Sequence, residues 1–301
     1  ENIDGQFKDG TPYQLIKPTV HIENPAYGDL HPDLLTSVRV TPTMIGLGLL
    51  DAIAEADILA NADPDDKNGD GISGRMNYVW DTAQQKTVSG RFGWKSNQPN
   101  IAQQVKGAFH GDMGLTSTLN PAENCTAVQK DCQNAPHGGQ PEVEDKIMDK
   151  VIFYSSTLGV PARRDASKPE VIQGEQLFAT AGCSSCHQPE FKTADYPAIK
   201  ELSKQKITPY SDLLLHDMGE GLADGRPDFL ANGREWRTPP LWGIGLVETV
   251  NGHTRFLHDG RARNLSEAIL WHGGEAEASK QAYIAMEKDH RDALIAFLNS
   301  L

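Results

Sequence analysis

The stretch Cys183-Ser-Ser-Cys186-His187 decides which fold this chain adopts. Two cysteines separated by two residues, with a histidine directly after the second, have the spacing of a covalent haem c attachment site. The two thiols add to the vinyl groups on one edge of a porphyrin, and the histidine then lies beneath the iron and can ligate it. The stretch therefore predicts a c-type haem held by Cys183, Cys186 and His187.

The sequence around this stretch favours haem attachment over two alternatives. Residues 174–178 (GEQLF) open an amphipathic helix that Gly182 ends just before the first cysteine, as at the start of a cytochrome c domain. A zinc site would need a second ligand pair at similar spacing, and the remaining cysteines, Cys125 and Cys132, are too far apart in sequence. A redox dithiol would need a βαβ pattern around it, and none is visible.

The composition limits the class of protein. With 301 residues the chain is long enough for two domains, and 38% hydrophobic with 23% charged residues indicates a globular protein. A net charge of −13 argues against nucleic-acid partners, whose phosphates select basic surfaces. No apolar run approaches the length of a membrane span. The chain starts at Glu1 in polar sequence, so we expect a processed or truncated piece of a longer protein.

Cysteine usage predicts the compartment. Cys125 and Cys132 lie in a polar loop with six residues between them, and in an oxidising compartment they would most simply form a disulfide. Two free thiols are the alternative. Covalent haem together with a local disulfide predicts an exported protein of the bacterial periplasm or cell exterior.

Apolar periodicity predicts a mainly α-helical fold, made of cytochrome c-like helical domains with long irregular loops. We expect one helix to begin at Thr41-Pro42 and to present apolar residues as far as Leu59. Further helices are expected over 100–109, 141–153 and 288–301, and a short strand over 13–20. A linker at 159–169 would separate an incomplete N-terminal cytochrome c-like domain (1–165) from a C-terminal cytochrome c domain (166–301) that holds one covalent haem.

An internal repeat supports two related units. Residues 41–50 (TPTMIGLGLL) align with 238–247 (TPPLWGIGLV), and 91–94 (RFGW) align with 255–258 (RFLH). An Asn-apolar pair follows each second segment at the same distance, at 100–101 and at 264–265. The first unit has no CxxCH, so either the chain is truncated or this unit has lost its haem. We favour truncation.

An acidic loop in the first unit resembles half of a calcium-binding motif. Asp66, Asn68 and Asp70 alternate with other residues and are followed by Gly71, as in the first half of an EF-hand loop. The twelfth position is Asn77, where the full motif has a bidentate glutamate, so a complete EF-hand is not expected. A partial Ca²⁺ loop completed from elsewhere and an acidic turn without metal both stay open, and calcium is the reading we follow.

Taken together, these segments resemble the di-haem cytochrome c peroxidase superfamily, and within it the branch of di-haem thiol oxidoreductases. The resemblance runs from about Gly28 to Leu301 and rests on GLGLLDAI, NGDGISGR, GRFGWK, DLLLHDMG, TPPLWGIGL and FLHDGRARNLSEAILWHGGEA. It implies an electron-transfer haem in the C-terminal domain and a second, catalytic haem in the N-terminal domain. Hydrogen peroxide would be reduced there, with a small redox protein or cytochrome as electron donor.

The resemblance also implies iron ligands and haem-edge residues in the C-terminal domain. His187 matches the proximal ligand, and His272 has the position of the distal ligand, which implies bis-histidine ligation. Met218, in the HDMG segment, is the rival ligand, and a helix-terminal role is the alternative for His272. His258 and Arg261 would serve the haem edge, because an arginine fork suits a propionate carboxylate.

For the first unit the resemblance implies three catalytic candidates. Trp94 would stand between the two haems, although a core tryptophan is the alternative. Gln104 matches a residue on the distal side of the catalytic haem, and Asp112 matches an acidic residue that could move protons between peroxide oxygens, at a spacing two residues shorter. His110 or Met113 could cap the iron instead. The alternative functions are an electron-transfer cytochrome without turnover and an oxidase of a protein substrate.

Overall fold

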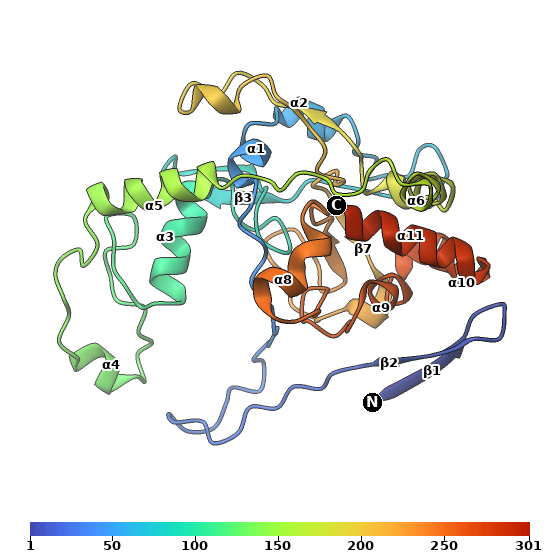
Figure 1. Cartoon of the computed structure of the whole chain (residues 1–301). Coiled ribbons are helices and arrows are strands. Elements are labelled where there is room, and N and C mark those ends of the chain that lie inside the picture. The colour runs from blue at the N-terminus through green and yellow to red at the C-terminus, as the bar shows by residue number, and fades with distance from the viewer.

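A computed structural model describes residues 1–301 as two groups of helices side by side, joined by long loops and short hairpins (Figure 1). The helices and strands are, in chain order, β1 (Asn2–Gln6), β2 (Pro12–Ile16), α1 (Leu47–Asp51), α2 (Glu55–Leu59), β3 (Tyr78–Asp81), β4 (Lys86–Ser89), α3 (Ile101–Gly111), α4 (Lys130–Asn134), α5 (Asp145–Thr157), α6 (Pro169–Thr180), η1 (Cys183–Ser185), β5 (Phe191–Lys192), η2 (Lys200–Leu202), β6 (Lys206–Ile207), β7 (Leu215–Asp217), α7 (Gly219–Leu222), β8 (Glu235–Arg237), η3 (Ile244–Leu246), α8 (Val247–Asn251), α9 (Leu265–Leu270), η4 (Gly274–Ala276), α10 (Glu277–Ala285) and α11 (Lys288–Ser300).

The prediction of a mainly α-helical fold is wrong. Helices account for only 33% of the residues and strands for 12%, and irregular segments form the rest. The helix expected to run from Thr41 to Leu59 shows the physical reason. Gly46 has a φ of +71°, which an α-helix cannot include, so α1 begins only after it, and α2 begins after an extended Ala54.

The longer helices match their predicted positions. The Asn100 side chain caps α3 by accepting a hydrogen bond from the Gln103 N–H at 2.9 Å. In the second half, α6 and α11 cross closely. A Cβ built on Gly174 of α6 would lie 2.0 Å from the Ala293 carbonyl oxygen of α11. The last helix of the chain thus packs on the first helix of the second half.

The strands form four separate two-stranded antiparallel sheets. The first, β1 with β2, pairs Asn2 with Ile16 and includes part of the strand expected over 13–20. Although this hairpin opens the chain, it lies beside the helices that end the chain (Figure 1). Asp9 in its turn forms an ion pair with Arg291 of α11 at 2.7 Å. The β1–β2 hairpin therefore packs against the C-terminal half of the chain.

The two copies of the repeated glycine segment pack against each other. Gly46 and Gly243 both have positive φ angles, +71° and +75°. A Cβ built on Gly46 would lie 2.3 Å from the Trp242 ring, and one built on Gly243 would lie 2.6 Å from Ile45 Cδ1. Since Ile45 and Trp242 occupy the same place in the two copies, the contact is reciprocal.

Each copy also meets a closing helix in the same way. A Cβ on Gly48 would lie 2.1 Å from the Ser156 carbonyl oxygen of α5, and a Cβ on Gly245 would lie 2.1 Å from the Asn299 carbonyl oxygen of α11. Both glycines therefore allow a backbone-to-backbone approach that no other residue permits. By this correspondence α5 is the counterpart of α11.

Two equivalent backbone hydrogen bonds, one in each direction, join the two halves at the Arg-Phe segments of the repeat. The Val40 N–H donates to the His258 carbonyl, and the Arg237 N–H donates to the Trp94 carbonyl, both at 2.8 Å. Val40 and Arg237 each precede a Thr-Pro of the repeat, and Trp94 and His258 each end an Arg-Phe segment. The repeat seen in the sequence is therefore a pseudo-twofold relation in space.

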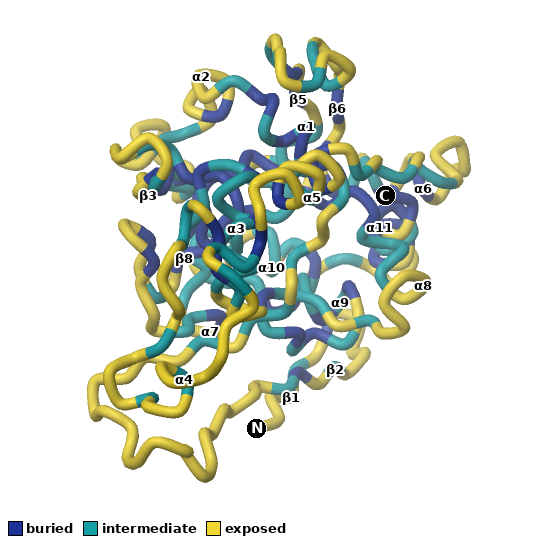
Figure 2. The backbone as a smooth tube through the Cα atoms, turned by 90° about the vertical axis from the view of Figure 1, so that its left-hand side faces the viewer, coloured by how far each residue is buried: buried dark blue, intermediate teal, exposed yellow.

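The correspondence ends at the outer face of α5. In the second half α6 covers α11, and Phe297 is fully buried. Its counterpart on α5, two residues before Ser156, is Tyr154, which is 63% exposed beside the 59% exposed Phe153. Figure 2 shows α5 largely at the surface, with the long segment before α1 also exposed. No helix of the first half covers this face.

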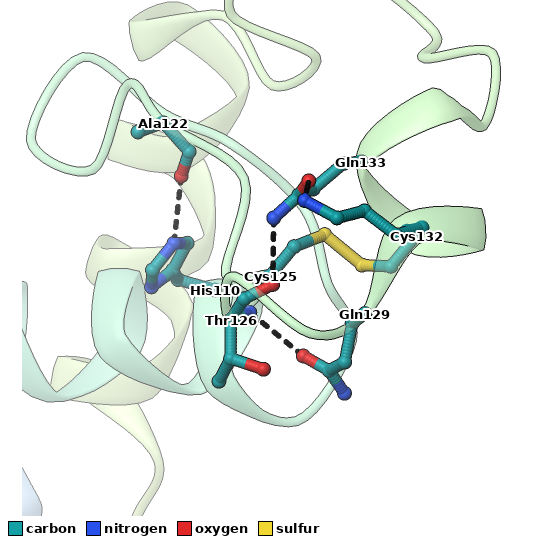
Figure 3. The surroundings of a disulfide bond; sticks show 8 residues. His110, Ala122, Cys125, Thr126, Gln129, Cys132 and Gln133 are labelled. Carbon is teal, nitrogen blue, oxygen red and sulfur yellow. Dashed lines mark hydrogen bonds between the residues drawn. A yellow bond between two sulfur atoms is a disulfide. The ribbon is translucent and has the colours of Figure 1, made fainter. Parts of the chain in front are cut away.

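The predicted disulfide is present between Cys125 and Cys132. It ties the loop before α4 to that helix, and the Gln133 side chain donates to the Thr126 carbonyl at 2.7 Å beside it (Figure 3). The His110 ring contacts the loop that leads to Cys125, with Nε2 2.9 Å from the Ala122 carbonyl oxygen (Figure 3). The structure contains no helix that could span a membrane.

Candidate functional site

One large cavity lies between the two halves. Its volume of about 1420 Å³ exceeds the roughly 300–1,000 Å³ of ordinary small-molecule pockets. Both halves contribute its walls, including both copies of the repeated glycine segment. Among the predicted site residues, the cavity is lined by Trp94, Gln104, Cys183, Cys186, His187, Met218, His258 and His272.

The two attachment cysteines lie on a short 3₁₀ turn at the cavity wall. Gly182, with a φ of +81°, ends α6 and lets the chain enter this turn. Burial raises the pKa of the Cys183 thiol to about 12 and also raises the pKa of Cys186. Both thiols are therefore protonated near neutral pH, which does not suit a reactive redox dithiol.

Two buried imidazoles line the cavity with one nitrogen each available. His187 Nδ1 is 2.8 Å from the Tyr210 carbonyl oxygen, and His272 Nδ1 is 2.7 Å from the Ala268 carbonyl oxygen. Each Nδ1 therefore donates, so each Nε2 is the acceptor-type nitrogen that binds a metal. Burial lowers the pKa of His187 to about 4 and lowers that of His272, so both rings are neutral.

These features fit a c-type haem. The cavity is large and mainly apolar, it carries the two cysteines of the attachment motif, and it holds two neutral imidazoles oriented by backbone carbonyls. Two buried polar atoms on its wall, Trp242 Nε1 and Gln104 Oε1, have no hydrogen-bond partner in the protein. A polar group of a bound ligand could pair with these atoms, because a buried donor or acceptor without a hydrogen-bond partner costs folding free energy. Cys183 and Cys186 would hold the haem, and His187 with His272 or Met218 would ligate its iron.

The structure adds a buried ionic cluster that the sequence did not predict. His216 is 3% exposed and lies between two carboxylates, with Nε2 2.8 Å from Asp212 Oδ2 and Nδ1 2.7 Å from Glu275 Oε2. The Cys186 sulfur is 3.6 Å from the same Nδ1. Burial alone would lower the pKa of His216, but hydrogen bonds to these three neighbours raise it well above its ordinary value. The histidine therefore carries a proton.

One sequence signal could have identified this cluster. Residues 212–216 read DLLLH, so an acid and a base lie four residues apart at the two ends of an apolar run. Polar residues that flank buried apolar ones must find partners inside the protein. Glu275, the third member, comes from a distant segment and carries no comparable signal.

Trp94 and His258 meet at the boundary between the halves. Their ring centroids are 6.5 Å apart in an edge-to-face arrangement, and the Trp94 Nε1–H donates to the Val40 carbonyl at 2.7 Å. The His258 ring also stacks on Trp236, with ring centroids 3.7 Å apart. Burial lowers the pKa of His258 to about 4, so the ring is neutral. Three aromatic rings thus follow one another along the cavity wall.

Other predicted residues lie away from the cavity. Asp112 lies at the exposed end of α3, Met113 is 60% exposed, and His110 faces the disulfide loop (Figure 3). Arg261 forms an ion pair with Asp259 at 2.8 Å and is not among the residues that line the cavity.

The acidic loop lies at the surface. The Asp66 carboxylate accepts a hydrogen bond from the Gly71 N–H at 3.2 Å, and the Asn68 side chain donates to Asp70 Oδ2 at 3.1 Å. Asn77, the twelfth position, is fully buried and donates to the Lys95 carbonyl at 2.7 Å. The loop therefore receives no ligand from that position.

Comparison with known proteins agrees with this geometry. A relative, the cytochrome c551 peroxidase of Nitrosomonas europaea, is 23% identical over 226 residues, which cover 69% of this chain and 60% of that protein. The chain thus spans about three fifths of the length of this curated relative. The family model described as "Di-haem oxidoreductase, putative peroxidase" matches residues 4–301. The resemblance inferred from the motifs is confirmed, and this chain belongs to the di-haem oxidoreductase family.

Proposed function

We propose that this chain forms the electron-relay part of a peroxide-reducing haem oxidoreductase. A haem attached at Cys183 and Cys186 would have its iron between His187 and His272. When bound, it supplies one-electron chemistry at a potential set by its axial ligands. A small redox protein or cytochrome would supply the electrons.

The observation that carries this proposal is the pair of oriented imidazoles. His187 follows the attachment cysteines, and His272 comes from the far end of the sequence, yet both line one cavity. In each ring Nδ1 donates a hydrogen bond to a backbone carbonyl, that of Tyr210 for His187 and that of Ala268 for His272. Neutral rings held in this way, each with its Nε2 free, would be suited to ligate a haem iron. Met218 lines the same cavity and stays the rival distal ligand.

A second, peroxide-activating haem would lie against the first half, for which this chain supplies no attachment motif. The pseudo-twofold relation supports this placement, because α5 exposes Tyr154 where α11 is covered by the helix that precedes its haem motif. Gln104 reaches the cavity with an unpaired oxygen. Trp94 would assist electron transfer between the haems, and Asp112 stays a prediction for proton movement.

Two further proposals concern the environment of the protein. Covalent haem and the disulfide between Cys125 and Cys132 support a periplasmic or extracellular location, where thiols oxidise. Calcium binding at Asp66, Asn68 and Asp70 is supported by the alternating oxygen ligands alone.

Hydrogen peroxide distinguishes this function from that of a simple electron carrier. A form of the protein that holds both haems is reduced and mixed with peroxide, and haem oxidation is followed by absorbance. We expect oxidation at least tenfold faster than for a small mono-haem cytochrome c. The carrier function is favoured by the single CxxCH motif of this chain. Equal oxidation rates would remove the peroxidase proposal.

A further inference from the structure

The ionic cluster of Asp212, His216 and Glu275 connects two segments that the haem site needs. At one end, the Asp212 N–H donates to the Cys186 carbonyl at 2.9 Å. At the other end, Glu275 follows His272 by three residues. His216 joins the two carboxylates by hydrogen bonds of 2.8 and 2.7 Å from its two nitrogens. The His216 imidazole thus spans from the attachment motif to the distal ligand segment.

The segment between His272 and Glu275 needs such an anchor. It consists of Gly273 and Gly274, and glycine restricts the backbone least of all residues. Gly274 has a φ of +54°, and a Cβ on it would lie 2.1 Å from the Asp217 carbonyl oxygen. The turn is therefore closely packed but has little stiffness of its own.

Glu275 accepts more hydrogen bonds than its link to His216. Its carboxylate also accepts hydrogen bonds from the Asp217 N–H at 3.1 Å and from the Ser73 hydroxyl at 2.8 Å. These partners lower the pKa of Glu275 although burial acts to raise it, so it stays ionised. The carboxylate therefore fixes the end of the glycine turn against two separate segments, β7 and the loop that contains Ser73.

The rival ligand lies directly across this turn. Met218 follows Asp217, and a Cβ on Gly273 would lie 3.1 Å from the Met218 carbonyl oxygen. Both Met218 and His272 line the cavity. The glycine turn therefore lies against the backbone of the segment that carries the rival ligand.

We propose that Asp212, His216 and Glu275 are positioning residues that hold His272 over the haem site and keep Met218 away from it. This inference rests on the proposed bis-histidine haem. It adds that the choice between nitrogen and sulfur as the distal ligand is made by side chains that do not touch the iron. Histidine in place of methionine lowers the haem potential, so the cluster also sets the driving force of electron transfer.

The test compares Glu275→Gln and Glu275→Ala with the wild-type protein carrying its attached haem. The control is Glu277→Gln, because Glu277 is two residues further on, pairs with Lys280 and makes no contact with His216. Low-spin electron paramagnetic resonance and near-infrared spectra identify the axial ligands, and a redox titration gives the potential. We expect Glu275→Ala to lose at least half of the bis-histidine signal and Glu277→Gln to lose none.

The potential should rise with the change of ligand. A tenfold loss in the preference of ferric over ferrous iron for His272 corresponds to a rise of about 59 mV. Removing the Glu275 charge also raises the potential, so the ligand spectrum decides. In the double variant Glu275→Ala/Met218→Leu the methionine signature should disappear. Glu275→Gln keeps the side-chain volume and gives the same readout if Glu275→Ala does not fold.

Different results would overturn the ligand assignment and the positioning inference. If the wild-type haem lacks bis-histidine ligation, the ligand assignment of the proposed function fails. If the wild-type haem has it and both Glu275 variants keep the same spectrum while only their melting temperatures fall, the cluster is purely structural and the positioning inference fails.

Discussion

The two halves of the molecule share one set of contacts and differ in what surrounds them. Gly48 meets α5 and Gly245 meets α11 at the same hypothetical Cβ distance, 2.1 Å from a carbonyl oxygen. Yet α11 is covered by α6, whereas α5 exposes Tyr154. Only the second half has an attachment motif and two oriented imidazoles. Close backbone packing and cofactor binding are therefore separable properties of this repeat.

This difference indicates which parts of the repeat are constrained by geometry. Gly46 and Gly243 require positive φ, and a side chain on either would overlap the other copy. At the ends of the second repeated segments, by contrast, Trp94 replaces His258 although both carbonyls accept equivalent hydrogen bonds. The pair of backbone hydrogen bonds thus joins the halves in the same way from both sides, whereas the side chains at these positions differ.

Replacing His187 should produce the largest effect, because it removes a proposed iron ligand of the haem site that only the second half contains. In His187→Ala the attached haem should lose its low-spin bis-histidine spectrum completely, while covalent attachment through Cys183 and Cys186 persists. Absorbance and electron paramagnetic resonance spectra measure the first, and a haem stain of the denatured protein measures the second. His290→Ala, on the exposed face of α11, is the control. An unchanged spectrum in His187→Ala would remove it as a ligand.

Truncating the two counterpart aromatic residues measures how unequally the closing helices are packed. Phe297 is fully buried, so Phe297→Ala should lower the free energy of unfolding by about 3–5 kcal/mol. Tyr154→Ala should cost less than about 0.5 kcal/mol, because that side chain is mostly solvated. Denaturant unfolding gives both values. Similar costs would mean that α5 is covered in solution by a part of the protein or by a partner.

The matched glycines test whether α5 can move where α11 cannot. A methyl group on Gly245 meets a backbone held by α6, so Gly245→Ala should cost about 1–3 kcal/mol of unfolding free energy. Gly48→Ala should cost less, since α5 is free on its outer face and can shift. Gly111→Ala is the control, because nothing lies within 4 Å of its added carbon, and it should stabilise by about 0.4–1 kcal/mol. A larger cost at Gly48 would contradict this picture.

Local patterns predicted the longer helices, the disulfide, the repeat and the family. The Asn100 cap of α3 and the apolar face of α11 are encoded by neighbouring residues, so the sequence reveals them. The overall helix content was overestimated because an apolar run such as 44–59 does not show where a glycine takes positive φ. That angle depends on the other copy of the repeat, which is 197 positions away.

The sequence indicates the candidate site most directly where the chemistry lies in one motif. The attachment stretch predicts Cys183, Cys186 and His187 as haem-binding residues and the resemblance implies His272. The structure places all four at one cavity, and their roles stay predictions. The cluster around His216 was missed, because its meaning depends on Glu275 approaching from 59 residues away. Contacts between distant segments leave no local trace, so polar partners inside a cavity are the least predictable part of such a site.

Calcium should have the smallest effect, and it tests a feature that only the first half has. If the loop at Asp66, Asn68 and Asp70 binds calcium, a concentration ten times the Kd should stabilise the protein by about 1.4 kcal/mol. Asp66→Asn should abolish this gain while keeping the turn, because asparagine tolerates the positive φ of +46° found there. Asp65→Asn, which alters only an exposed neighbour, should keep it. Thermal unfolding with calcium and with a chelator measures the difference. Identical melting temperatures in the wild-type protein would make the loop an acidic turn without metal.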